Sequence, residues 1–274
     1  MNTSFESVNI LGVRVDMMTM DQAVEQIEGW LTGGGGKHYI VTPNVEFIMA
    51  AHQDKEFQKV LNEADLAIPD SARLGWAKME LTQKNFLNKL LLWPLFLCPN
   101  LVPSSKFQVI TGTDLMEKLC EVSAKYGLTV GFLGGRNGVA IKASECLKQK
   151  YPELKVVLAE DGPEVDGEGN EVYSIQYSTP NTDLLFVAFG QMKQEKWIAQ
   201  NLSKIPVKVA MGVGGAFDYL SGSVPRAPGW MRGLGLEWLF RLIIQPWRIK
   251  RFGALVGFVW LILRSDGGNV KVKV

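Results

Sequence analysis

"TDLLFVAFGQMKQEKWIAQNLSKIPVKVAMGVGG" occupies residues 182–215. Two mainly apolar runs, 182–190 and 207–215, in which Asp183 and Lys208 are the charged residues, flank a polar segment with helical spacing at 192–203. A strand with one solvated face alternates apolar and polar residues, whereas continuous apolar runs are typical of strands covered by helices on both faces. The segment therefore predicts a strand–helix–strand unit of a parallel sheet.

The same alternation continues along the chain. Thr19 or Asp21 can cap a first helix that runs through Leu31. Further strands are predicted at 37–44, 66–70, 107–112, 128–135 and 154–160. Helices are predicted at 45–64, 113–127, 137–150 and 216–221, with a weaker one near 169–178. We expect an α/β fold: a Rossmann-like, open, mostly parallel sheet with helices on both faces.

Composition bounds the possibilities. The chain has 274 residues, of which 47% are hydrophobic, enough for a sizeable core and one large domain. Three cysteines without paired spacing indicate neither a disulfide framework nor a zinc site, and they fit a reducing cytosol. The first residues lack the pattern of a signal peptide. A net charge of +1 argues against a nucleic-acid-binding protein.

That charge is unevenly divided. Residues 226–274 carry nine lysines and arginines against two acids, a net +7, so the remaining chain is at −6. The same segment holds four of the eight tryptophans. We predict an α/β core at 1–225, with an apolar insert at 82–107, and a basic, Trp-rich, helical and membrane-proximal appendage at 226–274. Such a segment suits an anionic partner, here a membrane surface, although a solvated cationic face is the plainer alternative.

Two apolar segments leave alternatives open. "FLNKLLLWPLFLCPNLV" (86–102) is either a buried helix pair broken by Pro94 or a surface that meets lipid or another subunit. "GALVGFVWLIL" (253–263) is too short to span a bilayer, which takes roughly 20 apolar residues. It either deepens the attachment of the appendage to the membrane or packs against 86–102.

Ligands of open α/β sheets bind beyond the carboxyl ends of the strands. Polar residues and glycines that fall there are Thr42, Asn44, Asp70, Gly134, Gly135, Gln194 and Asp218. The turn in "FLGGRNG" (132–138) allows a phosphate to approach the backbone, although it is no GxGxxG fingerprint and a tight turn explains it equally well. The two histidines show no ligand spacing, so a metal site is not expected.

Asp70 is the strongest candidate for a catalytic carboxylate. It follows Pro69 at the end of an apolar strand, where partial desolvation raises basicity. The alternative is a structural one, in which Asp70 caps the helix that begins near Ser71.

Several blocks, taken together and in order, resemble the WecG/TagA/CpsF glycosyltransferases. They are "VTPNVEF", "ADLAIPD", "TGTDLM", "FLGGRNGVA", "GQMKQEKWIA", "GVGGAFDYLSGSVPRAPGWMRGLGLEWLFRL" and "QPWRIKR". The resemblance implies a metal-independent, inverting transfer of a sugar from a UDP-sugar. The acceptor would be a hydroxyl of a polyprenyl-diphosphate-linked saccharide at the cytoplasmic face of the membrane, in bacterial surface-polysaccharide or teichoic acid synthesis.

The resemblance also implies residue roles. Asp70 would be the general base, Thr42 and Asn44 would lie near the donor sugar and the base, and Gln194 would belong to the same site. Asp218 would lie near the uridine. Arginines of the appendage would stabilise the departing diphosphate: Arg241, Arg248 and Arg251.

The chain departs from the family pattern at several positions. Val109 stands where members often carry arginine, and Lys106 is a possible substitute. A Gly-Pro pair at 162–163 replaces a frequent Gly-Tyr, and Met192 replaces the usual proline. The donor sugar stays open among N-acetylmannosamine, its uronic acid and glucose, as do the acceptor saccharide and the oligomeric state. Rival functions are a nucleotide-dependent oxidoreductase and a non-catalytic membrane scaffold.

Overall fold

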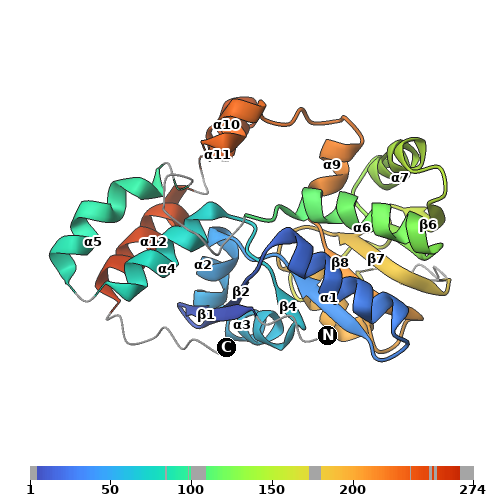
Figure 1. The fold of residues 1–274 in the computed structure, drawn as a ribbon, viewed down its shortest axis with the longest axis horizontal. Coiled ribbons are helices and arrows are strands. Elements are labelled where there is room, and N and C mark those ends of the chain that lie inside the picture. The colour runs from blue at the N-terminus through green and yellow to red at the C-terminus, as the bar shows by residue number, and fades with distance from the viewer. Residues whose placement is uncertain are drawn as a thin grey trace.

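The computed structural model describes residues 5–83, 85–97, 99, 109–172, 180–234, 236–246, 249 and 252–265. Its centre is a six-stranded sheet in the order β4-β3-β8-β7-β5-β6, and every adjacent pair is parallel (Figure 1). The strands are β3 (His38–Val41), β4 (Leu66–Ala67), β5 (Thr129–Gly134), β6 (Lys155–Glu160), β7 (Thr182–Ala188) and β8 (Val207–Gly212). The predicted fold class is confirmed.

The strand–helix–strand unit predicted at 182–215 folds as predicted. β7 and β8 flank α8 (Lys193–Asn201) and pair in register, with Leu184 opposite Val209. Successive residues of β7 bury on opposite faces, because Leu184 joins one apolar cluster and Leu185 joins another. Both faces of the strand are therefore covered from Leu184 onward, which is why 184–188 is an uninterrupted apolar run.

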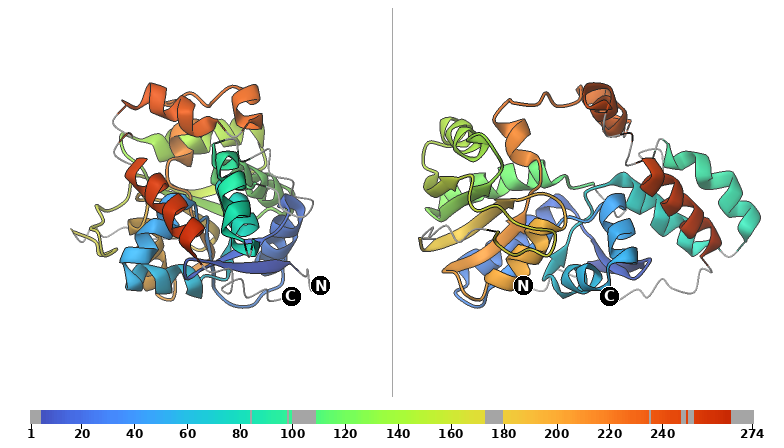
Figure 2. Two further views of the ribbon diagram at one scale, coloured as in Figure 1. Left: turned by 90° about the vertical axis from the view of Figure 1, so that its left-hand side faces the viewer. Right: turned by 180° about the vertical axis from the view of Figure 1, so that it is seen from behind.

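Helices cover both faces of the sheet (Figure 2). One face packs against α1 (Met20–Thr32), α6 (Gly112–Tyr126), α7 (Val139–Lys150) and α9 (Ala216–Leu220). The other packs against α8, while α2 (Val45–Gln53) and α3 (Lys55–Glu63) cover its β3–β4 edge. Thr19 caps α1 in a capping box with Gln22, which confirms one of the two predicted caps.

A hairpin of β1 (Glu6–Ile10) and β2 (Val13–Met17) precedes α1 and was not predicted. Its inward residues, such as Val8 and Val15, are buried beside α3 and α4 (Ala72–Thr82). The buried Asp16 carboxylate accepts a hydrogen bond from the Ala67 amide at 2.8 Å. The hairpin thereby closes the edge of the sheet beyond β4.

Three predicted elements were wrong in part. The helix expected at 45–64 is two helices, because Asp54 adopts an extended conformation and caps α3 by accepting from the Phe57 amide. Val109–Thr111 form no strand. β4 ends at Ala67, and the Ile110 amide donates to the Pro69 carbonyl while the Thr111 carbonyl accepts from the Leu115 amide of α6. Residues 107–108 lie outside the described part.

The helix expected near 169–178 is absent from the residues described there, 169–172. The Asp166 carboxylate accepts hydrogen bonds from the amides of Glu168 and Asn170, which makes a turn, and Val165 then bridges to Glu171. Short local bonds from an aspartate compete with helix formation in this way. Residues 173–179 lie outside the described part.

The last helix of the appendage lies with the apolar insert at one end of the molecule (Figure 1). The insert folds as α5 (Phe86–Leu92) and the 3₁₀ helix η1 (Trp93–Phe96), and the appendage as α10 (Gly229–Gly233), α11 (Glu237–Ile244) and α12 (Phe252–Arg264). Phe258 and Ile262 of α12 are fully buried, and Phe258 contacts the rings of Trp76 and Phe96. α12 therefore packs against α5, as one interpretation of 253–263 predicted, and against α2 and α4 as well. Val256 and Trp260 of the same helix stay exposed, and membrane contact of this segment stays a prediction.

The insert itself is largely uncovered. Leu87 is 65% exposed and Leu91 is 77% exposed, whereas Phe96 is buried. The structure thus departs from a buried helix pair and presents the apolar surface of the second interpretation. Among the described residues, no helix is both long and apolar enough to cross a bilayer.

Candidate active site

A crevice opens at the carboxyl ends of β3 and β8, which are neighbours in the sheet. The chain leaves β3 toward α2 on one face and leaves β8 toward α9 on the other. Loops that diverge in this way leave a gap at the strand ends, where open α/β sheets bind their ligands.

Two adjoining cavities occupy this region. The strand-end cavity has a volume of about 260 Å³, and its wall includes Thr42, Gly190, Gln194, Gly214, Gly215 and Asp218. The helix cavity, of about 400 Å³, lies toward α4, α11 and α12, and its wall includes Arg73, Trp238, Leu242, Phe252 and Leu255. Residues common to both walls are Asn44, Glu46, Asp70, Thr111, Arg226, Glu237 and Arg241.

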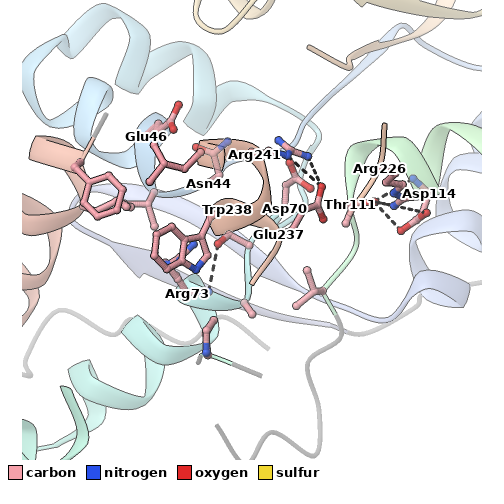
Figure 3. Close-up of a pocket in the computed structure, with 18 residues that line it drawn as sticks. Asn44, Glu46, Asp70, Arg73, Thr111, Asp114, Arg226, Glu237, Trp238 and Arg241 are labelled. Carbon is pink, nitrogen blue, oxygen red and sulfur yellow. Dashed lines mark hydrogen bonds and ion pairs between the residues drawn. The ribbon is translucent and has the colours of Figure 1, made fainter. Parts of the chain in front are cut away.

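Asp70 lies on the shared wall (Figure 3). Its backbone amide donates to the Pro43 carbonyl at 3.0 Å, and its Oδ1 accepts from the Gly112 amide at 3.1 Å. Burial raises the pKa of Asp70 to about 7, against the opposing charge of Arg241 and the Gly112 hydrogen bond. Ser71, not Asp70, caps α4, so the structural alternative for Asp70 was wrong.

Arg241 projects from α11 to the same wall. Burial lowers the pKa of Arg241 and is the largest single cause. The charge and hydrogen bond of Glu237, one turn earlier, together with Tyr219 and Asp70, outweigh burial and hold this pKa above its usual value. Its guanidinium carbon lies 4.9 Å from the centroid of the Tyr219 ring. Arg241 is therefore a fixed cation beside a carboxylate of raised pKa, an arrangement found at catalytic centres.

A second cation, Arg226, was missed by the sequence analysis. It pairs with Asp114 at 2.7 Å and donates to the Thr111 hydroxyl at 3.3 Å. Thr111 also caps α6 by accepting from the Asp114 amide. The only sequence signal for this site was an arginine just after the last strand–helix unit of an acidic body.

The four polar residues predicted at the strand ends line the strand-end cavity. Asn44 caps α2 through its Oδ1, which accepts from the Phe47 amide at 3.1 Å. Gln194 is 2% exposed, and its Oε1 accepts from the Gly214 amide at 3.0 Å. Thr42 is buried, and burial raises the pKa of Asp218. The structure thus brings these four residues together with Asp70.

Other residues of the "KQEKW" block (193–197) make structural contacts. Glu195 is fully buried, burial raises its pKa to about 7, and it accepts from the Met192 amide and from Gln194. Lys196 pairs with Asp54 at 2.9 Å and with Glu168 at 2.8 Å. Only Gln194 of this block reaches a cavity, which separates its predicted role from that of its neighbours.

Gly134 and Gly135 line neither cavity. A side chain on Gly134, at φ +107°, would come within 2.7 Å of the Ala188 backbone. Close packing therefore accounts for glycine at these positions. Phosphate binding at this turn stays a prediction.

The other predicted arginines, Arg248 and Arg251, lie outside the described residues, as does Lys106. α11, which carries Arg241, ends at Ile244. Val109, the departure from the family pattern, lines the helix cavity. In the described part of the chain, no three His, Cys, Asp or Glu side chains gather to hold a metal ion.

Comparison with known proteins gives one answer. The family model described as "Glycosyl transferase WecG/TagA/CpsF family" matches residues 8–89 and 93–270. A curated Bacillus subtilis (strain 168) protein, named N-acetylglucosaminyldiphosphoundecaprenol N-acetyl-beta-D-mannosaminyltransferase, is 30% identical over 238 residues, 84% of each chain. A Staphylococcus aureus (strain MRSA252) protein of the same name is 30% identical over 97% of this chain and 96% of its own. The chain therefore belongs to the WecG/TagA/CpsF family of glycosyltransferases.

Proposed function

We propose that this glycosyltransferase moves N-acetylmannosamine from its UDP derivative to a hydroxyl of a polyprenyl-diphosphate-linked N-acetylglucosamine. The names of the two relatives support this choice of sugars, and the near full-length match to both supports carrying it over. The reaction would serve bacterial surface-polysaccharide synthesis.

The position of Asp70 carries the proposal. It stands on the wall that a polar cavity at the strand ends shares with a cavity lined by apolar helices. A general base that activates the acceptor hydroxyl next to the donor sugar has to lie where the two substrates meet. With a pKa of about 7, its carboxylate is a much stronger base than an exposed aspartate and is still half ionised at neutral pH.

The chemistry is a single displacement. The acceptor oxygen forms a bond to the anomeric carbon, Asp70 takes the hydroxyl proton, and the bond from the anomeric carbon to UDP breaks with its electrons passing to the diphosphate. One displacement inverts the anomeric centre. The departing diphosphate needs positive charge and N–H donors. Arg241, the amides around Gly214 and the arginines Arg248 and Arg251 are our candidates, and no metal ion is required.

We place the protein on the cytoplasmic face of the membrane, where its lipid-linked acceptor would be. Two features support this: the +7 charge of residues 226–274 and the exposed leucines of α5. Each basic residue near an anionic leaflet contributes about 1 kcal/mol. Removing residues 226–274 would also remove Phe258 and Ile262 from the core, so surface substitutions test membrane binding more cleanly than truncation.

The test is a transfer assay with a panel of UDP-sugars and a short-chain polyprenyl-diphosphate N-acetylglucosamine, with products identified by mass spectrometry. We expect UDP-N-acetylmannosamine to be used and EDTA to leave the rate unchanged. Transfer from no UDP-sugar, together with a thermal shift by NAD(P) and none by UDP, would contradict the proposal.

A further inference from the structure

Arg73, the second residue of α4, is a buried cation that has no counterion in the described part of the chain. It is 8% exposed and lines the helix cavity. Its Nε is buried without a hydrogen-bond acceptor, and no carboxylate among the described residues pairs with its guanidinium. Burial lowers the pKa of Arg73 to about 10. An unpaired buried charge is costly, so its presence in a cavity wall indicates an anion that comes from outside the chain.

Two aromatic rings fix this guanidinium. Its carbon lies 5.0 Å from the centroid of Phe96 and 5.2 Å from that of Trp238, and Figure 3 shows Arg73 beside Trp238. Cation–ring contacts hold the guanidinium in place, but they do not give its N–H groups oxygen acceptors. The planar fork of donors remains available, and that fork matches the oxygens of a phosphate group.

The surroundings of Arg73 favour an anion attached to an apolar chain. Arg73 lines only the helix cavity, which it shares with Leu242, Phe252 and Leu255. α12, which supplies Phe252 and Leu255, packs against α5 with its exposed leucines. A nucleotide finds its amides and polar side chains in the other cavity, whereas a lipid diphosphate needs a cation next to apolar walls.

We propose that Arg73 binds the diphosphate of the polyprenyl-linked acceptor and, with Leu242, Phe252 and Leu255, forms the subsite that separates this lipid diphosphate from the UDP group of the donor. This inference rests on the proposed function, because it assumes a lipid-linked acceptor. Arg73 would hold the acceptor with its hydroxyl directed at Asp70, which lies on the same cavity wall.

The experiment measures binding by calorimetry, without turnover, to farnesyl diphosphate, farnesol and UDP. Arg73→Gln should weaken farnesyl diphosphate binding about 10- to 100-fold, as expected when a charged hydrogen-bonded pair is lost, and should leave UDP binding unchanged. Arg73→Lys keeps the charge but not the fork, so its loss should be smaller. Lys78→Gln is the matched control, because Lys78 is a cation of the same helix that pairs with Glu6 away from the cavity.

A second measurement separates binding from structure. Replacing an uncompensated buried charge should leave the melting temperature of Arg73→Gln unchanged or raise it. Unaltered farnesyl diphosphate binding, an equal loss of UDP binding, or a lower melting temperature with weaker binding of every ligand would each overturn the inference. Wild-type sugar transfer alongside any of these results would leave the proposed function standing. Arg73-dependent binding of farnesyl diphosphate without sugar transfer to any acceptor would retain the anion site and remove the function.

Discussion

The strand-end cavity and the helix cavity share Asp70 and Arg241 but are built differently. The first is formed by loops that follow parallel strands, and it offers backbone amides, glycines and small polar side chains such as Gln194. The second is formed by helices from two distant parts of the chain, and it offers aromatic and aliphatic side chains around Arg73. We propose that the strand-end cavity binds the nucleotide and the helix cavity binds the lipid-linked acceptor. Catalysis would then take place where the two cavities meet.

The largest effect should follow substitution of Asp70, because it faces both cavities. Asp70→Asn keeps the shape but removes the base, so kcat should fall by about 10²- to 10⁴-fold. Calorimetry should find UDP binding intact. A near-normal kcat would show that the meeting point of the cavities is not the catalytic centre.

The same substitution has a consequence for stability. The folded-state pKa of Asp70, about 7, lies above its ordinary value of 3.8, so the folded protein holds the proton more tightly. Stability from this group is present at low pH and is lost as the pH rises from about 4 to about 7. Asp70→Asn should therefore melt higher than the wild type at pH 8, with a smaller difference at pH 5. Lower melting at pH 8 would contradict the raised pKa.

Substitution of Arg241 should have the next largest effect. Arg241 also faces both cavities, and its proposed role is to stabilise the negative charge of the departing diphosphate. Arg241→Gln should lower kcat by about 10²- to 10³-fold, the usual cost of removing one transition-state donor. Its charge lowers the pKa of Asp70, so its loss should move the acid limb of the kcat/KM profile to higher pH. Arg241→Lys should keep the limb near its wild-type position. An unmoved limb in Arg241→Gln would mean that the two groups do not interact.

Asp218 tests the strand-end cavity alone, because it lines that cavity and not the other. Asp218→Asn exchanges a hydrogen-bond acceptor for an amide and should raise the KM for the UDP-sugar about tenfold. The KM for the lipid-linked acceptor should not change. A rise in the acceptor KM alone would reverse our placement of the two substrates.

Leu242 gives the converse test, because it lines only the helix cavity. Leu242→Asn keeps the side-chain length and branching but places an amide on an apolar wall, and should raise the acceptor KM several-fold while leaving the donor KM unchanged. Steady-state kinetics with each substrate varied in turn would measure both. Equal effects on the two KM values would argue that the cavities act as one.

The smallest effect on turnover should come from the exposed face of α5. Leu87→Gln with Leu91→Gln removes apolar surface far from Asp70, so kcat on a water-soluble acceptor should be that of the wild type. Binding to anionic liposomes should weaken, as measured by co-sedimentation. The matched control is Ile141→Gln with Val157→Gln, which removes exposed apolar side chains from α7 and β6. Wild-type sedimentation of the leucine variant would exclude α5 from membrane contact.

The sequence by itself determined the parallel sheet, because a strand buried on both faces has to be apolar along its buried part, as 184–189 is. It also placed Asp70, Asn44 and Gln194 at one edge, since carboxyl ends of parallel strands share an edge. The cap at Thr19 could be predicted from the sequence because its hydrogen bonds join residues only three positions apart. The hairpin before α1 was not, because its strands are short and are stabilised by distant contacts such as Asp16 with Ala67.

Only the tertiary structure decided the helix cavity. Arg226 reaches Thr111 across 115 positions of sequence, and Arg73 of α4 meets Trp238 of α11. No periodicity connects such residues, because their proximity depends on how α4, α11 and α12 pack around Phe258. The same packing buries Phe258 and Ile262 of 253–263 in the core. Local patterns decide which elements form, and long-range burial decides which side chains share a wall.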